Sequence, residues 1–336
     1  MRRVVWPLLP LVPLYGAAQA LDSTAYARGW RRAERLRWPV VSVGNLSVGG
    51  AGKTPFVIAL ARALTGRGWS VDVLSRGYGR ASDAVERVMA QDVDDPAARY
   101  GDEPWLIARR GEVPVFVGRN RVAAGRLAEL PLVDAPGARH VHLLDDGMQH
   151  RGLVRDAEIV LLHRSDFQTT LLPSGRLREP LAALERADIM VLREEDMDLA
   201  ERARRWMRRD ARISMIRREL QVPTLPGAAV VFSAIAHPEE FVNGLRAKGV
   251  SIVTSKAWRD HHRFTDGDVT MLREVAAKDQ ASCFVTTEKD MVRLTKTQRA
   301  RLEQTGPVLA ASLTVRLLEP EAVLAALEER LEQRGA

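Results

Sequence analysis

A glycine-rich segment, SVGGAGKT, has the composition of a phosphate-binding loop. The general loop reads G-x-x-x-x-G-K-[ST], and Ser47 stands where its first glycine is expected. Glycines let backbone N–H groups approach phosphate oxygens, while Lys53 would neutralise the β and γ oxygens and Thr54 would hold Mg²⁺. Because an apolar strand precedes it and a helix follows, we predict a nucleotide-phosphate site here, with a ligand-free turn as the alternative. Its residues are Ser47, Val48, Gly49, Gly50, Ala51, Gly52, Lys53 and Thr54.

A second segment, HVHLLDDGMQH at residues 140–150, places two carboxylates at the end of an apolar strand. Asp145 and Asp146 have the form of a Walker B element, because strand-end carboxylates lie near the phosphate loop in parallel sheets. Their oxygens would bind Mg²⁺ directly or through water. A simple Asp-Asp-Gly turn is the alternative for this segment taken alone, but its pairing with the glycine-rich loop favours a metal site.

Two further motifs carry groups that accept protons. Asp102 lies in GDEP at a probable helix start, where position alone favours a helix cap and chemistry permits a base for an acceptor hydroxyl. His261 and His262 lie in the polar loop RDHHRF, and their spacing is poor for a metal without partners. If this loop faces the glycine-rich loop across a cleft, His261 would tune a carboxylate.

The elements expected around these motifs alternate between apolar strands and helices. This order favours an α/β fold, a parallel sheet covered on both faces as in P-loop NTPases. A boundary is expected at QVPTLPG, residues 221–227, with a smaller α/β unit beyond it. We therefore expect an N-terminal membrane-associated segment (1–28), a P-loop domain (29–222) and a second α/β domain (226–336). The last helix is assigned to the second domain, with packing on the first left open.

Composition and charge narrow the classes of partner. The net charge is +7 and the isoelectric point is about 10.0. Such a balance favours an anionic partner: nucleic acid, acidic lipid or a phosphorylated substrate. Nucleic acid is the weaker option because no nucleic-acid module is recognisable. The single cysteine, Cys283, excludes a disulfide framework.

The N-terminal stretch, MRRVVWPLLPLVPLYGAAQA, has the plan of a secretory signal peptide. Three prolines in seven residues disfavour a straight membrane-spanning helix. The following segment, ARGWRRAERLRW, supplies arginines and tryptophans that suit an anionic membrane surface. Taken alone, this stretch supports two interpretations almost equally well: a cleaved signal peptide and a retained membrane anchor.

Together the motifs resemble one family. GNLSVGGAGKTP, SRGYGR, GDEP, DDGMQH, PSGRLREP, DHHRF and TTEKD occur in this order between Gly44 and Asp290. The set is similar to tetraacyldisaccharide 4'-kinase, a lipid A pathway enzyme of Gram-negative bacteria, and the resemblance covers nearly the whole chain. The modified loop with Ser47 is a trait of that family.

The resemblance implies an ATP- and Mg²⁺-dependent kinase that phosphorylates the 4'-hydroxyl of a tetraacylated disaccharide 1-phosphate. It would act at the cytoplasmic face of the inner membrane, against an anionic membrane surface, so the N-terminal stretch is expected to be a retained anchor. Asp102 paired with His261 matches the catalytic base. The residues matched to metal, nucleotide or substrate are Lys53, Thr54, Asp145, Asp146, Glu179, Tyr78, Arg178, Gln149 and His150.

The chain departs from the family pattern at two places. Met148 stands where phenylalanine is common, and Ala234 and Ala236 replace common glycines in SAIAHP. Other readings remain: another phosphate-loop enzyme such as a GTPase, an exported binding protein, or a basic nucleic-acid binder. The missing Asn-Lys-x-Asp motif counts against a GTPase. The sequence does not determine the oligomeric state.

Overall fold

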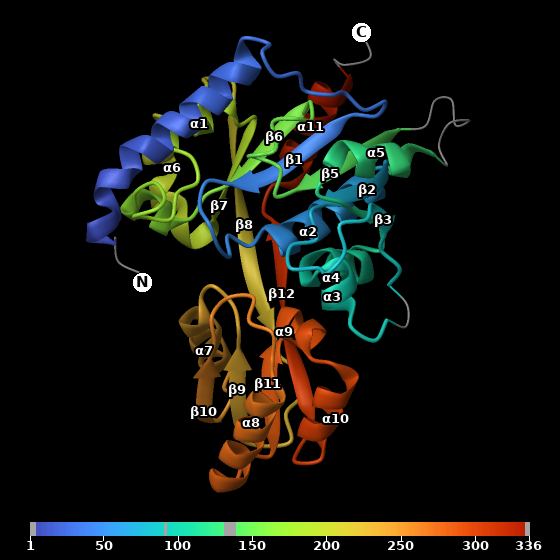
Figure 1. Cartoon of the computed structure of the whole chain (residues 1–336), viewed down its shortest axis with the longest axis vertical. Helices are drawn as coiled ribbons and strands as arrows, with labels where there is room; N and C mark the ends of the chain where they lie inside the picture. The colour runs from blue at the N-terminus through green and yellow to red at the C-terminus, as the bar shows by residue number, and fades with distance from the viewer. Residues whose placement is uncertain (1–4, 91–92, 131–138, 333–336) are drawn as a thin grey trace.

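A computed structural model describes residues 5–90, 93–130 and 139–332, and these residues form two α/β domains that share one sheet (Figure 1). Within this part of the chain the sheet has twelve strands in the order β10-β9-β11-β12-β8-β7-β6-β1-β5-β2-β4-β3. Most neighbouring strands are parallel, and only the β12–β8 and β3–β4 pairs are antiparallel. The mixed α/β class with a parallel-dominated sheet is confirmed.

The first domain is built on strands that, apart from the short edge strand β3 and the first residue of β2, are buried on both faces. Such strands read as continuous apolar runs because helices cover both sides of a parallel sheet. Its strands are β1 (Val40–Asn45), β2 (Ser70–Ser75), β3 (Glu86–Arg87), β4 (Val115–Val117), β5 (His140–Asp145), β6 (Ala157–Leu161) and β7 (Ile189–Arg193).

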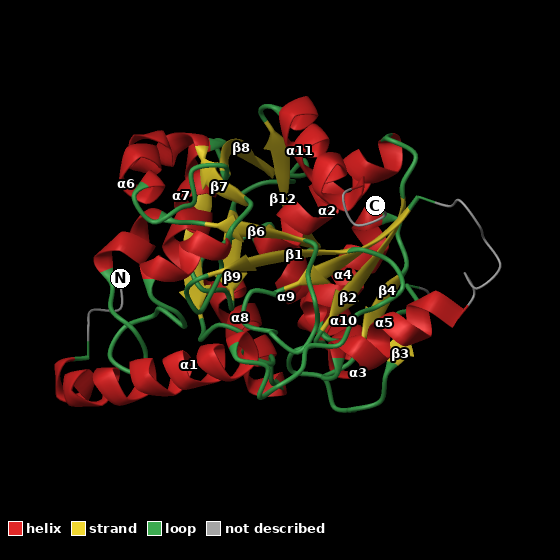
Figure 2. Ribbon diagram, turned by 90° about the horizontal axis from the view of Figure 1, so that it is seen from above, coloured by secondary structure: helices red, strands yellow, loops and turns green. Residues whose placement is uncertain are grey.

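Helices cover the two faces of this sheet, as Figure 2 shows from above. On one face pack α2, α4 and α11, which share a core with β1, β2, β5 and β6. On the other face α5 covers β2 and β5. The helical segments of this domain are α2 (Lys53–Gly66), α3 (Pro96–Tyr100), α4 (Asp102–Gly111), α5 (Arg121–Glu129), η3 (Arg164–Gln168), η4 (Leu181–Arg186), η5 (Glu194–Leu199), α6 (Ala200–Arg204) and α11 (Pro320–Glu332).

The second domain repeats the plan on a smaller scale. Its strands are covered by α8 and α10 on one face and by α7 on the other. Thr265 and Asp268 form a capping box that starts α8 directly after the RDHHRF loop. Its elements are β9 (Ala229–Ser233), α7 (Pro238–Ala247), β10 (Ile252–Ala257), α8 (Asp266–Lys278), β11 (Cys283–Thr287), α9 (Glu288–Arg293) and α10 (Lys296–Glu303).

Two long strands, β8 (Arg212–Gln221) and β12 (Val308–Leu317), run from one domain to the other (Figure 1). They pair antiparallel, from Ser312 opposite Gln221 to Leu317 opposite Ile216. Sequence analysis expected neither strand. The arginines of β8 and the half-exposed alternation of both strands lack the apolar run that marks a buried strand. The final helix α11 buries its apolar side chains in the core of the first domain.

The N-terminal segment is helical but irregular. A 3-10 helix, η1 (Trp6–Leu11), contains Pro10 and leads into α1 (Val12–Ala27), as the prolines predict. Figures 1 and 2 show α1 lying along the outside of the first domain. Among the described residues, no helix has the length and apolar character needed to cross a membrane.

Candidate active site

The glycine-rich loop (residues 47–54) connects the end of β1 to the start of α2, as its sequence predicts. Gly52 adopts a left-handed conformation with φ 82° and caps α2, and Gly49 has φ 105°. Both values favour glycine. The loop is also fastened from outside: Val48 N–H donates to Arg176 O over 2.8 Å, and Arg176 Nη2 donates to Val48 O over 2.8 Å. Arg176 therefore binds both the N–H and the C=O of Val48 and fixes the start of the loop. The loop leads into the N-terminus of α2, and helix N-termini favour anions.

Lys53 reaches back over the end of β1. Its Nζ donates to Asn45 Oδ1 over 2.8 Å and lies 3.3 Å from Asp146 Oδ1. Arg178 donates to both oxygens of Asp146, over 2.9 and 2.8 Å, and to Asn45 Oδ1 over 2.6 Å. Burial works against ionisation, but the Lys53 and Arg178 cations lower the pKa of Asp146 well below its usual range. Asp146 is therefore ionised in this state.

Asp145 behaves differently from its neighbour. It is 2% exposed, and Ser75 Oγ donates to its Oδ2 over 3.0 Å. Burial, followed by the charges of Glu103 and Asp146, raises the pKa of Asp145 to about 7. Its Oδ1 is buried without a hydrogen-bond partner among the described residues. A buried carboxylate oxygen that no protein group binds has the chemistry of a ligand for a hard divalent cation.

A cavity of about 650 Å³ joins these groups to the second domain. From the first domain it is lined by the glycine-rich loop, Asp145, Asp146 and Glu103, and from the second by His261 and Lys289. Lys289 Nζ binds Glu103 Oε1 across the domain boundary, and Arg110 Nη1 donates to Glu288 Oε2 over 2.6 Å. The cleft is thus an interdomain site whose two walls are already tied by ion pairs.

Asp102 and His261 meet at this boundary although 159 positions separate them in the chain (261 minus 102). His261 Nδ1 lies 3.6 Å from Asp102 Oδ2. Gly101 holds the cap position of α4, and Asp102 is its first helical residue, 4% exposed. The Asp102 hydrogen bond, followed by burial that opposes it, raises the pKa of His261. Asp102 is therefore not the N-cap of α4, and its carboxylate is instead paired with His261.

The other predicted residues divide into two groups. Tyr78 lines the cavity, and its ring packs edge-on to His261 with centroids 5.0 Å apart. Glu179 is 2% exposed, does not line the cavity, and accepts from Gln149, Arg151 and Arg186. Its role as a metal ligand stays a prediction.

Gln149 and His150 follow the aspartate pair. Gln149 Nε2 donates to Asn45 O over 3.2 Å, which links the strand-end turn to β1. Burial, with the charges of Arg121 and Arg155, lowers the pKa of His150 to about 4. His150 is therefore neutral at physiological pH.

Sequence reasoning missed several residues that the structure brings to the site. Glu103 and Lys289 belong to motifs that were noted, GDEP and TTEKD, yet neither residue was singled out. Arg293 lies three positions beyond TTEKD and contacts Asp102 Oδ2 through Nε over 2.9 Å. In the sequence, these three residues are marked only as charged side chains near the ends of strands. Charged side chains in such positions are usually solvated, so the sequence offered no reason to select them.

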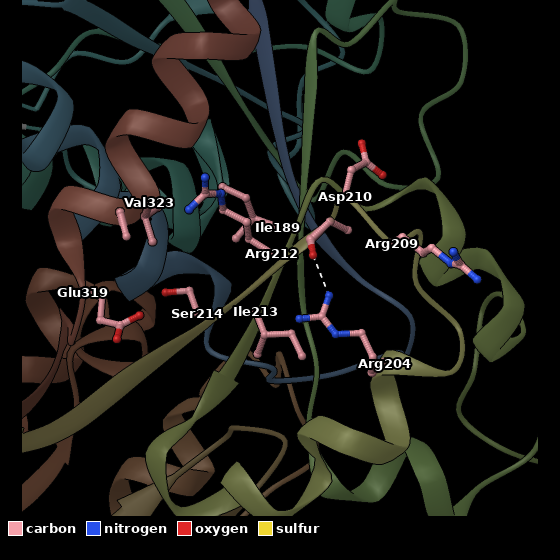
Figure 3. Close-up of a pocket in the computed structure, with 11 residues that line it drawn as sticks. Ile189, Arg204, Arg209, Asp210, Arg212, Ile213, Ser214, Glu319 and Val323 are labelled. Atoms are coloured by element: carbon pink, nitrogen blue, oxygen red, sulfur yellow. Dashed lines mark hydrogen bonds between the residues drawn. The ribbon is translucent and has the colours of Figure 1, made fainter.

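A second pocket, about 540 Å³ in volume, lies between β8, α6 and α11, far from these groups in the fold (Figure 3). Figure 3 shows Arg204, whose Nη1 donates to Ala211 O over 2.6 Å. This second pocket is lined by arginines together with Asp210 and Glu319, and none of the predicted site residues lines it. The interdomain cavity is therefore the candidate active site.

The interdomain cavity brings a glycine-rich strand–loop–helix turn opposite an acid–imidazole pair, and this arrangement fits an α/β phosphotransferase. The family model described as tetraacyldisaccharide-1-P 4'-kinase matches residues 4–332. The chain belongs to this family of lipid A biosynthesis kinases.

Individual relatives agree with the family match. The chain is 39% identical over 335 residues to a tetraacyldisaccharide 4'-kinase of Koribacter versatilis, covering 97% of this chain and 99% of that protein. It is 41% identical over 311 residues to the protein of that name from Anaeromyxobacter dehalogenans strain 2CP-C, covering 86% and 81%. A crystal structure of LpxK from Aquifex aeolicus in complex with ATP superposes with a TM-score of 0.73 at 30% identity, covering 97% of this chain and 98% of that one.

Proposed function

We propose that the interdomain cavity is where this kinase transfers the γ-phosphoryl group of ATP to the 4'-hydroxyl of tetraacyldisaccharide 1-phosphate. The observation that carries the proposal is the convergence of the glycine-rich loop, the Asp145–Asp146 pair and His261 on one cavity. In this P-loop NTPase-like arrangement the first domain would bind the nucleotide. The second domain would contribute the imidazole that meets the acceptor.

The glycine-rich loop and Lys53 would hold the β- and γ-phosphates. Backbone N–H groups at the start of α2 present partial positive charge, and the Lys53 ammonium adds a full one. Phosphoryl transfer depends mainly on positioning and on neutralising charge on the phosphoryl oxygens. When ATP binds, Lys53 would exchange its contact with Asp146 for contacts with phosphate oxygens.

Asp145, Asp146 and the Thr54 hydroxyl fit a Mg²⁺ site. The fit rests on the unpartnered Oδ1 of Asp145, the adjacent ionised Asp146 and the buried Thr54 at the start of α2. Bound Mg²⁺ would supply Lewis-acid neutralisation of the phosphate charge. Arg178 would orient Asp146 through its paired hydrogen bonds and keep that carboxylate ionised.

Asp102 and His261 would take the proton of the acceptor hydroxyl. A sugar hydroxyl has a high pKa, so a positioned base assists as the new bond to phosphorus forms. Because the two groups come from different domains, domain closure would bring the pair to the acceptor. The long strands β8 and β12 are the connections along which such a movement would bend.

Turnover of Asp102→Asn and His261→Gln variants tests the assignment. We expect each to lower kcat by about 10²-fold or more, the usual contribution of a general base, while ATP binding measured by calorimetry stays near the wild-type value. His262→Gln, at the neighbouring position, is the matched control and should retain kcat. Near-normal turnover of both Asp102→Asn and His261→Gln would overturn the assignment.

The N-terminal segment would hold the enzyme on the cytoplasmic face of an anionic membrane. Its apolar side chains are unusually exposed for a folded chain: Trp6 74%, Leu14 68%, Leu21 67% and Trp30 68%. Arginines follow directly after α1, which suits acidic headgroups. Together they would place the cavity within reach of a lipid substrate.

Vesicle sedimentation tests the membrane proposal. Leu14→Glu and Leu21→Glu should weaken binding of the full-length protein to phosphatidylglycerol vesicles and leave calorimetric ATP binding intact. Val253→Glu changes an exposed apolar residue of the second domain and should sediment like the wild type. Full sedimentation of the Leu14→Glu/Leu21→Glu variant would count against the anchor, as would full sedimentation after deletion of residues 1–20.

A further inference from the structure

Arg293 is the last residue of α9, the helix that begins within the TTEKD motif, and its guanidinium is almost fully enclosed. The residue is 7% exposed. Nε donates to Asp102 Oδ2 over 2.9 Å, and Nη2 reaches the same oxygen. Nη1 donates to Ala234 O over 2.7 Å and to Asp290 Oδ1 over 2.8 Å. Every nitrogen of the side chain therefore has a partner, and the main one is the Asp102 carboxylate, which is paired with His261.

The same guanidinium also faces the imidazole. Nη2 lies 3.1 Å from His261 Nδ1, so one cation sits between the two members of the acid–imidazole pair. Asp102 Oδ1 accepts from the Glu103 backbone N–H over 3.0 Å. Both oxygens of Asp102 are thus bound, and the carboxylate has a single orientation.

We propose that Arg293 is a positioning residue of the phosphoryl transfer, which keeps Asp102 ionised and fixed so that His261 receives the proton of the acceptor hydroxyl. The inference rests on the proposed roles of Asp102 and His261. In the step, the hydroxyl oxygen bonds to the γ-phosphorus as the bond from phosphorus to the ADP oxygen breaks. The hydroxyl proton passes to Nε2 of the imidazole, in the tautomer whose Nδ1–H faces Asp102, and Asp102 stabilises the resulting imidazolium.

The pKa shifts of Asp102 and His261 indicate which of the two accepts the proton. Burial opposes ionisation of Asp102, but the His261 hydrogen bond and the Arg293 and Lys289 charges hold its pKa well below the usual range. A carboxylate so acidic is a poor proton acceptor. His261 is the more basic partner, because the Asp102 carboxylate, 3.6 Å from its Nδ1, raises the pKa of the ring.

Arg293 also limits how basic His261 becomes. The guanidinium charge opposes protonation of the ring, whereas Asp102 and Asp260 favour it. Asp260 Oδ1 lies 3.8 Å from His261 Nε2, and Asp290 faces Arg293 from within α9. Among the described residues, Glu103 and Lys289 complete the charged groups around the pair. Without Arg293, a charge that opposes protonation of the ring would be lost, so a larger share of His261 would already carry a proton at a given pH and would be unable to accept another.

The pH dependence of kcat/KM for the full-length enzyme, measured with ATP and the disaccharide 1-phosphate in detergent, tests the proposal. Arg293→Met should move the acidic limb of the profile up by about one unit, the effect expected for losing one adjacent charge. Activity at pH 7 should fall about tenfold or more and recover at higher pH as His261 deprotonates. Arg293→Lys keeps the charge and should restore the wild-type limb.

Lys296→Met is the matched control. It removes an exposed ion pair with Asp94, 3.0 Å long, which also crosses between the domains but lies away from the acid–imidazole pair. Its profile should match the wild type. An Arg293→Met enzyme with an unchanged limb and unchanged activity would overturn the proposal, because Arg293 would then serve the fold alone.

A double variant keeps the test decisive if Arg293→Met does not fold. Asp102→Asn/Arg293→Met removes both charges of the Asp102–Arg293 ion pair, while the buried Asp290 loses its ion pair with Arg293 and keeps its hydrogen bonds from Ala234 N–H and Thr287 Oγ1. If Arg293 acts through Asp102, this variant should be no less active than Asp102→Asn alone, since coupled residues are not additive. Multiplied losses would refute the inference. Near-normal activity of Asp102→Asn and His261→Gln would instead refute the proposed base, which is a separate result.

Discussion

A buried histidine under α5 makes stability depend on pH in a direction that the structure predicts. His142 Nδ1 lies 2.8 Å from Asp72 Oδ1, and its Nε2 lies 3.3 Å from Glu129 Oε1. His140 Nε2 adds a contact of 2.8 Å to Asp72 Oδ2. Burial opposes the charge, but Asp72 and Glu129 raise the pKa of His142 to about 9. The ring is therefore an imidazolium held between two carboxylates at neutral pH.

The size of the effect follows from the shift. An unfolded histidine has a pKa near 6.5, so a native value of about 9 corresponds to about 3 kcal/mol at about 1.4 kcal/mol per unit. The native state binds the extra proton. The stabilisation is therefore complete below pH 6.5 and is lost as the pH rises through 9.

Urea unfolding of the full-length protein from pH 6 to pH 10 measures this loss. The matched variant is Asp72→Asn/His142→Gln, which removes both charges and retains similar shapes. Relative to that variant, the wild type should lose about 3 kcal/mol of unfolding free energy between pH 6.5 and 9.5. Histidine ring signals in NMR should show one group titrating near 9. Parallel pH profiles for the two proteins would refute the reasoning.

Two more predictions concern the glycine-rich loop and the N-terminal helix. Gly49→Ala would place a Cβ 2.2 Å from Arg176 Nη2 at φ 105°, so strain and a lost hydrogen bond should weaken ATP binding in calorimetry by about tenfold or more. Gly66→Ala, in open space, is its control, and equal ATP affinities would contradict the prediction. Tyr15→Phe removes the 3.0 Å hydrogen bond from α1 to Arg178 O and should lower kcat by about two- to tenfold. Vesicle sedimentation should not change, and an unaltered kcat would show that α1 does not support the active-site loop.

Local chemistry made part of the site predictable. The glycine-rich loop and the Asp145–Asp146 pair each lie within a few residues of a buried strand. Because all carboxyl ends of a parallel sheet meet at one edge, the sequence order alone places them together. The proline-rich start of the chain likewise predicted an irregular helix, which η1 confirms.

The connection between the domains was not predictable in the same way. Strand β8 reads RISMIRRELQ, and its arginines are tolerated because Arg212 and Arg217 are exposed and Arg218 forms ion pairs with Glu195 and Glu240. Its partner β12 lies about a hundred residues further on, from Val308 to Leu317. The pairing of two segments so far apart in the chain depends on how both domains pack. A local sequence pattern does not predict that packing.

The residue types and the strand-end motifs were enough to indicate phosphate chemistry and the family, because backbone N–H groups, glycines and carboxylates act through short-range geometry. Which charged side chain meets which was decided only by tertiary packing. Folding brings Arg293 against Asp102 and surrounds Glu179 with arginines, and it leaves one oxygen of Asp145 without a hydrogen-bond partner in the part of the chain that the structure describes. The pKa of each group depends on burial and on charges within a few ångströms, and those neighbours come from segments far apart in the chain.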